Sequence, residues 1–90
     1  MAISNHIQNY YESLVTEEIQ HRANKDYPNQ NLDFYTDVAC VALNNLPAKY
    51  IRYEVDLAFY MSQTEHVQIR NQVAKAVDDA LKFVKERKDR

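Results

Sequence analysis

The first part of the chain repeats apolar side chains at spacings of three and four, which places them on one face of a helix. Ser4 or Asn5 can cap the start of this helix, and we expect it to run to about His21. The stretch 23–31 is polar and contains Pro28, so it predicts a loop. The apolar positions of the helix are Ile7, Tyr11, Leu14, Val15 and Ile19.

A second helix is predicted from about Asp33 to Leu46. Its centre, residues 38–43, is apolar on every side, and a helix of that kind has to be covered all round by other elements. A buried strand is the alternative, because short apolar runs occur in both structures. Two alanines and the length of the pattern favour the helix. Pro47 should end it, because proline pushes the preceding residue out of the helical conformation.

The segment 50–60 alternates apolar residues with polar or small ones, and a period of two is typical of an extended strand. Ile51, Val55 and Phe59 are spaced four residues apart and therefore also share a helical face. Strand, helix or both in succession therefore stay open here. The alternating apolar residues are Ile51, Tyr53, Val55, Leu57 and Phe59.

A long final helix is predicted from the capping box Ser62–Glu65 to about Glu86. At 1.5 Å per residue, about 22 residues span roughly 33 Å, which exceeds the diameter of about 31 Å expected for a compact domain of this length. Two other helices can cover the apolar stripe of such a helix only in part, so we expect a homodimer. The stripe consists of Val67, Val73, Ala74, Val77, Ala80, Leu81 and Val84.

These elements predict a mainly α fold. We expect a single domain over residues 1–90, with three to four helices per subunit and a short extended segment near residues 50–56, assembled as a helical homodimer. The chain contains no glycine, which excludes glycine-rich phosphate-binding loops. Its net charge of −2 indicates no duplex nucleic acid as partner. We see neither an apolar run long enough to span a membrane nor a signal sequence, so we expect no membrane partner and a cytoplasmic protein.

The sequence shows no arrangement of side chains that is typical of catalysis or metal binding. Glu17 and His21 lie four residues apart on one side of a helix, but two such residues are common on solvated helix faces. Cys40 is the single cysteine, so an internal disulfide is excluded. It lies in an apolar run, where we expect it to be buried as a small hydrophobic residue. We therefore expect no enzyme activity, no metal and no cofactor.

The candidate binding residues follow the proline that ends the second helix. Arginine can bind guanine in a bidentate manner, and tyrosine can stack on the base. A carboxylate can accept from the N–H edge of the base, and lysine can offset phosphate charge. Alternatively, the tyrosines lie at the edge of the core, and Arg52 pairs with Glu54 or Asp56. The candidates for ligand binding are Lys49, Tyr50, Arg52, Asp56 and Tyr60.

Residues 37–50, DVACVALNNLPAKY, resemble the signature of the late-competence protein ComFB family, roughly D-V-x-A-L-A-L-N-x-L-P-P-x-Y. The segment NYYESLV is similar to the N-terminal segment of the family, and residues 52–60 are similar to its proteobacterial branch. The resemblance covers most of the chain from Asn5 to Val84. The residues that match the signature are Asp37, Leu43, Asn44, Leu46, Pro47 and Tyr50. In structural terms, Asp37 could pair with a cation on a neighbouring helix, and Asn44 could satisfy backbone groups at the helix end.

The resemblance implies a small helical dimer without enzymatic activity. Cyanobacterial relatives look like receptors for cyclic di-GMP, linked to natural competence and type IV pili. We therefore expect a regulatory protein for competence, type IV pilus or motility control that binds a cyclic dinucleotide and an unknown partner protein. The alternative is a ligand-free dimeric adaptor. The family's zinc does not carry over, because the cysteine cluster before Asp37 is missing here. Ala48 and Lys49 replace a proline and an arginine of the signature, and lysine lacks the planar fork of arginine.

Overall fold

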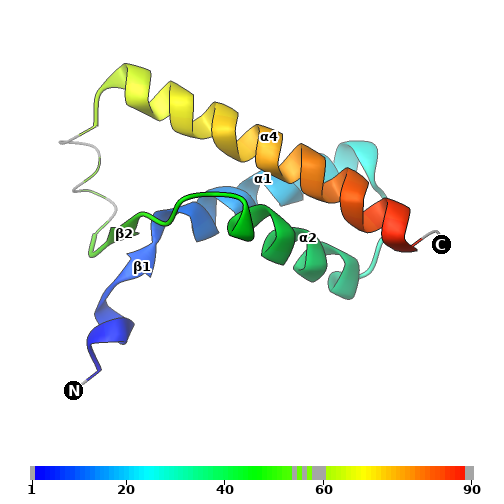
Figure 1. The fold of residues 1–90 in the computed structure, drawn as a ribbon, viewed down its shortest axis with the longest axis horizontal. Helices are drawn as coiled ribbons and strands as arrows, with labels where there is room; N and C mark the ends of the chain where they lie inside the picture. Colours follow the sequence, from blue (N-terminus) through cyan, green and yellow to red (C-terminus); the bar gives the residue numbers. More distant parts are fainter. Residues whose placement is uncertain (1, 54, 56, 58–60, 89–90) are drawn as a thin grey trace.

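The computed structural model of the protein describes residues 2–53, 55, 57 and 61–88. Most of them are helical, and two short strands form an antiparallel ribbon (Figure 1). The expected mainly α architecture with a short extended segment is therefore confirmed. The elements of the described residues are the 3-10 turn η1 (Ile3–His6), strand β1 (Gln8–Asn9), helix α1 (Tyr10–Asp26), helix α2 (Leu32–Asn44), strand β2 (Tyr50–Ile51) and helix α4 (Gln63–Lys88).

Helix α1 starts later than the sequence pattern predicts. Its N-cap is Asn9, whose Oδ1 accepts from the Tyr11 N–H at 3.2 Å, so the prediction of Ser4 or Asn5 as the cap was wrong. The reason is tertiary: residues 8–9 pair with β2 and are therefore extended, which an N-cap requires. The helix also continues past His21 to Asp26 and shortens the predicted loop. Asn29 in this loop has a φ of 72°, a left-handed conformation that asparagine tolerates.

Helix α2 presents one buried face to the core. Asn31 caps it by accepting from the Phe34 N–H at 2.9 Å, and Phe34, Val38 and Ala42 are buried at helical spacing. Cys40 is exposed, so the predictions that this cysteine is buried and that the helix is covered all round were both wrong. Within one chain, α1 and α4 pack against one side of α2 only. The helix ends before Pro47, as predicted, although two residues earlier than expected.

Helix α4 begins at the predicted capping box. The Ser62 hydroxyl accepts from the Glu65 N–H at 3.1 Å and donates to the Glu65 carboxylate at 3.3 Å. The predicted apolar stripe is correct in its C-terminal part and wrong at Val67, whose surface is 46% exposed. The N-terminal half of α4 extends beyond the end of α2, so nothing from α2 covers it (Figure 1). The buried residues of α4 are Val73, Ala76, Val77, Ala80, Leu81 and Val84.

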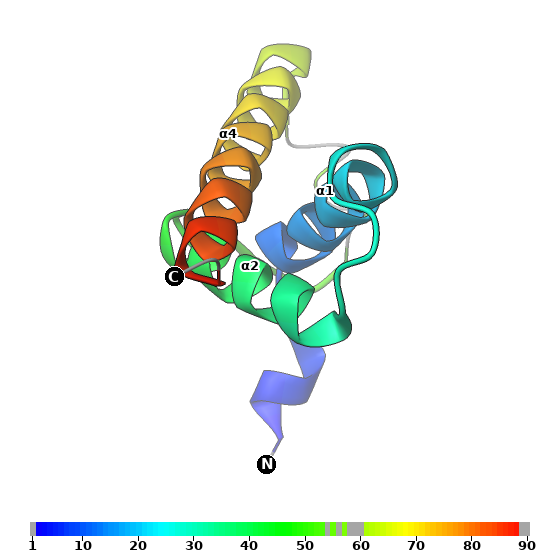
Figure 2. The same ribbon diagram turned by 90° about the vertical axis from the view of Figure 1, so that its right-hand side faces the viewer.

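The three helices form two layers. Helices α1 and α4 lie side by side, and α2 crosses beneath both of them (Figure 2). Each helix contributes side chains that are fully buried in the shared core, with Val15 from α1, Val38 from α2, and Val77 and Leu81 from α4. A second, smaller cluster of Ile51, Leu57 and Met61 lies beneath the ribbon. The molecule is consequently flat, with principal extents of 43 × 36 × 20 Å.

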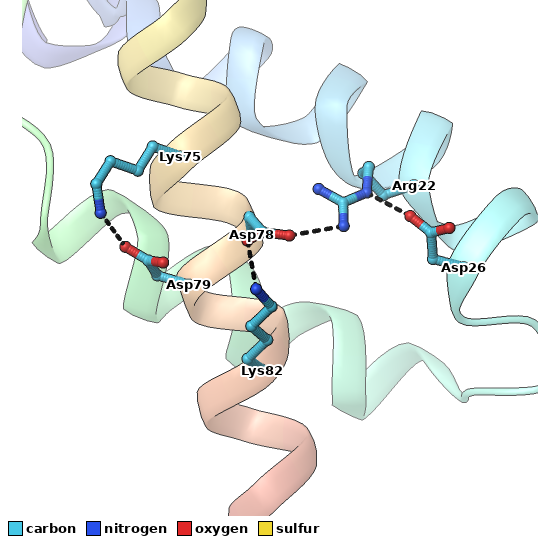
Figure 3. Close-up of polar contacts among 6 residues, drawn as sticks. All are labelled: Arg22, Asp26, Lys75, Asp78, Asp79 and Lys82. Atoms are coloured by element: carbon cyan, nitrogen blue, oxygen red, sulfur yellow. Dashed lines mark hydrogen bonds and ion pairs between the residues drawn. The ribbon is translucent and has the colours of Figure 1, made fainter.

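An arginine joins α1 to α4 on the surface of the core (Figure 3). Arg22 donates from Nη2 to Asp78 at 2.8 Å and from Nε to Asp26 at 2.7 Å. Lys82 also contacts Asp78, at 3.0 Å. Arg22 first and Lys82 second hold the pKa of the Asp78 carboxyl below its usual value, because both stabilise the ionised form. This network holds the two helices together over the half of α4 that is buried.

No helix in the described part of the chain combines the length and apolar character needed to cross a membrane.

Candidate functional site

The segment after Pro47 is held against the start of α1 by the side chain and backbone around Asn9. The Oδ1 of Asn9 caps α1 and also accepts from the Lys49 N–H at 3.0 Å. The Lys49 carbonyl in turn accepts from the Tyr10 N–H at 2.7 Å. Gln8 pairs with Ile51 and Asn9 with Tyr50 in the antiparallel ribbon. The backbone that carries the predicted binding residues is therefore fixed on both sides.

The ribbon sorts neighbouring side chains between core and surface. Ile51 is buried in the small cluster beneath it, whereas Tyr50 is 66% exposed. Alternate residues of a strand point to opposite faces, so burial of Ile51 turns Tyr50 outward. Arg52 is exposed as well, and its Cζ lies 5.0 Å from the centre of the Tyr53 ring, which is 53% exposed. The outward face thus presents two aromatic rings and a guanidinium group.

Two of the five predicted ligand-binding residues, Tyr50 and Arg52, lie exposed in this surface. Lys49 directly precedes Tyr50 and is half-buried. The remaining two candidates, Asp56 and Tyr60, lie outside the described residues. So do both carboxylates that the alternative interpretation offers as partners of Arg52.

The predicted alternation of buried and exposed residues ends with the strand. Tyr53 and Val55 are exposed, although the period of two would have placed both on the same side as Ile51. Residues 55 and 57 are helical, so the extended conformation is restricted to the start of the segment. Phe59 lies outside the described residues.

The signature residues mainly shape the turn that leads into the ribbon. Leu43 and Leu46 are half-buried against the core, and Pro47 follows the end of α2. Asn44 is exposed, and the side chain that bonds the helix backbone is that of Asn45, whose Nδ2 donates to the Val41 carbonyl at 3.0 Å. The expectation that Asn44 serves this purpose was therefore misplaced by one residue.

Asp37 lies away from the ribbon, in a depression of about 550 Å³ between α2 and the C-terminal end of α4. Arg87 and Lys88 line the same depression, but Asp37 forms no ion pair with any described residue. The suggested pairing with a cation of a neighbouring helix is therefore absent from the described part of the chain. Cys40 opens into this depression too.

Glu17 and His21 line a cleft between α1 and α4 of about 450 Å³. Within the described ranges, no three side chains of histidine, cysteine, aspartate or glutamate lie close enough together to hold a metal ion.

Two residues of the ribbon site were missed in the sequence. Tyr53 was not among the candidates, although it directly follows Arg52, and an arginine beside an aromatic residue is a recurring stacked pair. Asn9 was missed because the cap was assigned earlier in the chain. Its spacing from Glu12 is the asparagine–glutamate pattern of a helix start and could have identified it.

The site offers flat aromatic surfaces next to positive charge. Such a surface suits a planar, anionic ligand, because the rings stack on a base and the cations offset phosphate charge. The chain matches the family model described as late competence development protein ComFB over residues 8–88. Comparisons with curated proteins and with solved structures found no match. With a match that extends from the ribbon through the whole of α4, the chain belongs to the ComFB family of late competence development proteins.

Proposed function

We propose that this ComFB-family protein is a regulatory protein without enzyme activity, which binds a cyclic dinucleotide on the outward face of its ribbon. The ligand that best fits this chemistry is cyclic di-GMP. The bound protein then acts through a partner protein in the control of competence, type IV pili or motility. It is expected to work in the cytoplasm as a homodimer.

The observation that carries this proposal is the Arg52–Tyr53 stack beside exposed Tyr50. A guanidinium group that lies over a ring keeps its N–H edge free for the O6 and N7 acceptors of guanine. Tyr50 adds a second ring for a base, and Lys49 adds positive charge near the phosphates. Cyclic di-GMP carries two guanines and two phosphates. One ligand can therefore use the contacts to the base and the contacts to the phosphates at the same time.

The fixed backbone of the ribbon favours binding. Asn9 and Tyr10 hold Lys49 through two hydrogen bonds. The backbone is therefore already ordered and loses little further conformational entropy when a ligand binds. Such preorganisation improves affinity by lowering the entropy lost on binding.

The direct test is calorimetric titration of the purified chain with cyclic di-GMP, with cyclic di-AMP as the comparison ligand. We expect binding of cyclic di-GMP that becomes at least tenfold weaker in Arg52→Ala and in Tyr53→Leu. Lys75→Ala is the matched control, since Lys75 is an exposed cation that pairs with Asp79 on the same helix, away from the ribbon. It should bind as the wild type does, and circular dichroism should show that all variants remain folded.

Two results would refute the proposal. One is the absence of heat and of a thermal shift at saturating cyclic di-GMP. The other is binding that Arg52→Ala and Tyr53→Leu leave unchanged, because the ligand would then lie elsewhere on the molecule.

A second candidate function is a ligand-free adaptor. The same end of the molecule exposes Tyr50, Tyr53 and Val55, and exposed apolar groups that lie together are typical of protein-binding surfaces. This alternative predicts no response to either cyclic dinucleotide. It also predicts that the double variant Tyr50→Ala, Tyr53→Ala weakens the capture of a partner protein. Added nucleotide should leave that capture unchanged.

A further inference from the structure

The cleft between α1 and α4 has an apolar floor and two walls of opposite charge. Leu14 of α1 and Ile69 and Val73 of α4 contribute to the floor. Glu17 and Glu18 stand on the α1 wall, and Arg70 stands on the α4 wall. No residue of α2 lines the cleft, whose lining comes from α1 and α4 alone.

The charges of the two walls do not neutralise each other within one chain. Among the ion pairs of the described residues, none includes Glu17, Glu18 or Arg70. By contrast, Asp78 and Asp79 in the C-terminal half of α4 form ion pairs within the chain (Figure 3). In the half of α4 that α2 leaves uncovered, Arg70 forms no ion pair with a described residue.

The burial of the inward face of α4 decreases where the helix lines the cleft. His66, Ile69, Arg70 and Val73 follow one another at spacings of three and four, and Val77 and Leu81 continue the same face of α4 into the core. Val77 and Leu81 are fully buried, whereas His66 and Ile69 are half-buried and Arg70 is exposed. The inward face of α4 is thus buried from Val73 onward and more exposed before it.

The chain exposes more surface than a compact monomer of its mass, and the excess is as large as a protein interface. The chain exposes 6634 Å², whereas a folded monomer of this mass exposes about 5,500 Å². The excess of about 1,100 Å² exceeds the roughly 800 Å² that each partner buries in a typical complex. Part of the excess belongs to the N-terminal arm before β1, which lies apart from the helices (Figure 1). The radius of gyration of 14.4 Å likewise exceeds the value of about 12 Å for a compact chain of this length.

We infer that a second copy of this chain occupies the cleft, with the acidic wall of each copy facing the basic wall of the other. This inference rests on the proposed homodimer and specifies its interface. A two-fold axis repeats every contact, so Arg70 of one copy meets Glu17 and Glu18 of its partner twice. One acidic and one basic wall per copy make the surface complementary to itself. The two apolar floors then extend the core across the axis.

Charge reversal tests the interface through the mass of the full chain in solution, measured by light scattering over a range of concentrations. Arg70→Glu places like charges opposite each other, and so does the double variant Glu17→Arg, Glu18→Arg. We expect each to weaken dimerisation by about tenfold or more. Combining all three substitutions restores opposite charges and should recover most of the dimer. Matched controls are Glu12→Arg on α1 and Gln68→Glu on α4, both exposed and outside the cleft.

The outcomes separate this inference from the proposed function. Loss of the dimer in both reversals, with recovery in their combination, supports the cleft as the interface. A dimer that neither reversal weakens overturns the cleft interface and leaves the dimer itself in place. A monomeric wild-type chain overturns both the interface and the dimer. Binding of cyclic di-GMP is measured separately, so its presence or absence decides the ligand site alone.

Discussion

Replacing Asn9 by alanine should destabilise the protein by about 2 kcal/mol. The Asn9 side chain accepts two hydrogen bonds, one from the Tyr11 N–H at the start of α1 and one from the Lys49 N–H in the segment before β2. Loss of an N-cap costs about 1 kcal/mol, and loss of a hydrogen bond to a backbone N–H costs about as much again. Both bonds disappear together, because one oxygen accepts both.

Urea and thermal unfolding followed by circular dichroism measure this loss. For a domain of this size, about 2 kcal/mol corresponds to a fall in Tm of roughly 8–16 °C. Asn9→Asp should remain close to the wild type, because a carboxylate accepts the same two bonds and is favoured at a helix N-terminus.

Asn5→Ala is the matched control, since Asn5 lies in the N-terminal arm and its side chain caps no helix. We expect it to change the free energy of unfolding by less than about 0.5 kcal/mol. The reasoning is refuted if Asn9→Ala is as stable as the wild type. It is equally refuted if Asn5→Ala is the more damaging substitution, because the cap would then lie at the earlier position.

The remaining predictions concern charge, packing and exposure. Asp78→Asn should lower stability in urea unfolding at neutral pH. Because Arg22 lowers the pKa of Asp78 in the folded state, the carboxylate stabilises the fold above its unfolded pKa of about 3.9. The difference should shrink as the pH falls below that value and vanish once the carboxyl is protonated in the folded state as well. Leu81→Ala should cost about 2–5 kcal/mol, whereas Val67→Ala should cost less than about 0.5 kcal/mol, and equal losses would contradict the burial of one and the exposure of the other. Cys40 should react with a thiol reagent in the native protein; reaction only after unfolding would show that the outer face of α2 is covered.

Local patterns in the sequence were sufficient to predict the three helices and the inward faces of α1 and of the C-terminal half of α4. The spacing of apolar residues identifies which side of α1 and of the C-terminal half of α4 enters the core, because one face of a helix repeats every three to four residues. The capping box at Ser62 and the proline at position 47 predicted helix ends for equally local reasons. The family signature was recognisable for the same reason, since it lies within one continuous segment.

The errors arose where distant segments meet. The start of α1 depends on β2, which lies some forty residues away and makes residues 8–9 extended. The exposure of Cys40 and Val67 depends on where other helices end, and a hydropathy pattern contains no information about that. The site shows the same division: residue types near Lys49 indicated a ligand, but only the ribbon shows that Tyr50 points outward while Ile51 is buried.

The sequence by itself therefore determined the helical class, the family and the chemistry available after Pro47. Each follows from interactions between residues close together in the chain. Tertiary structure decided which of these side chains reach solvent, through the bonds of Asn9 to both α1 and the segment before β2. It also decided that α2 leaves the N-terminal half of α4 uncovered, because coverage depends on how the three helices cross and not on the pattern within any one of them.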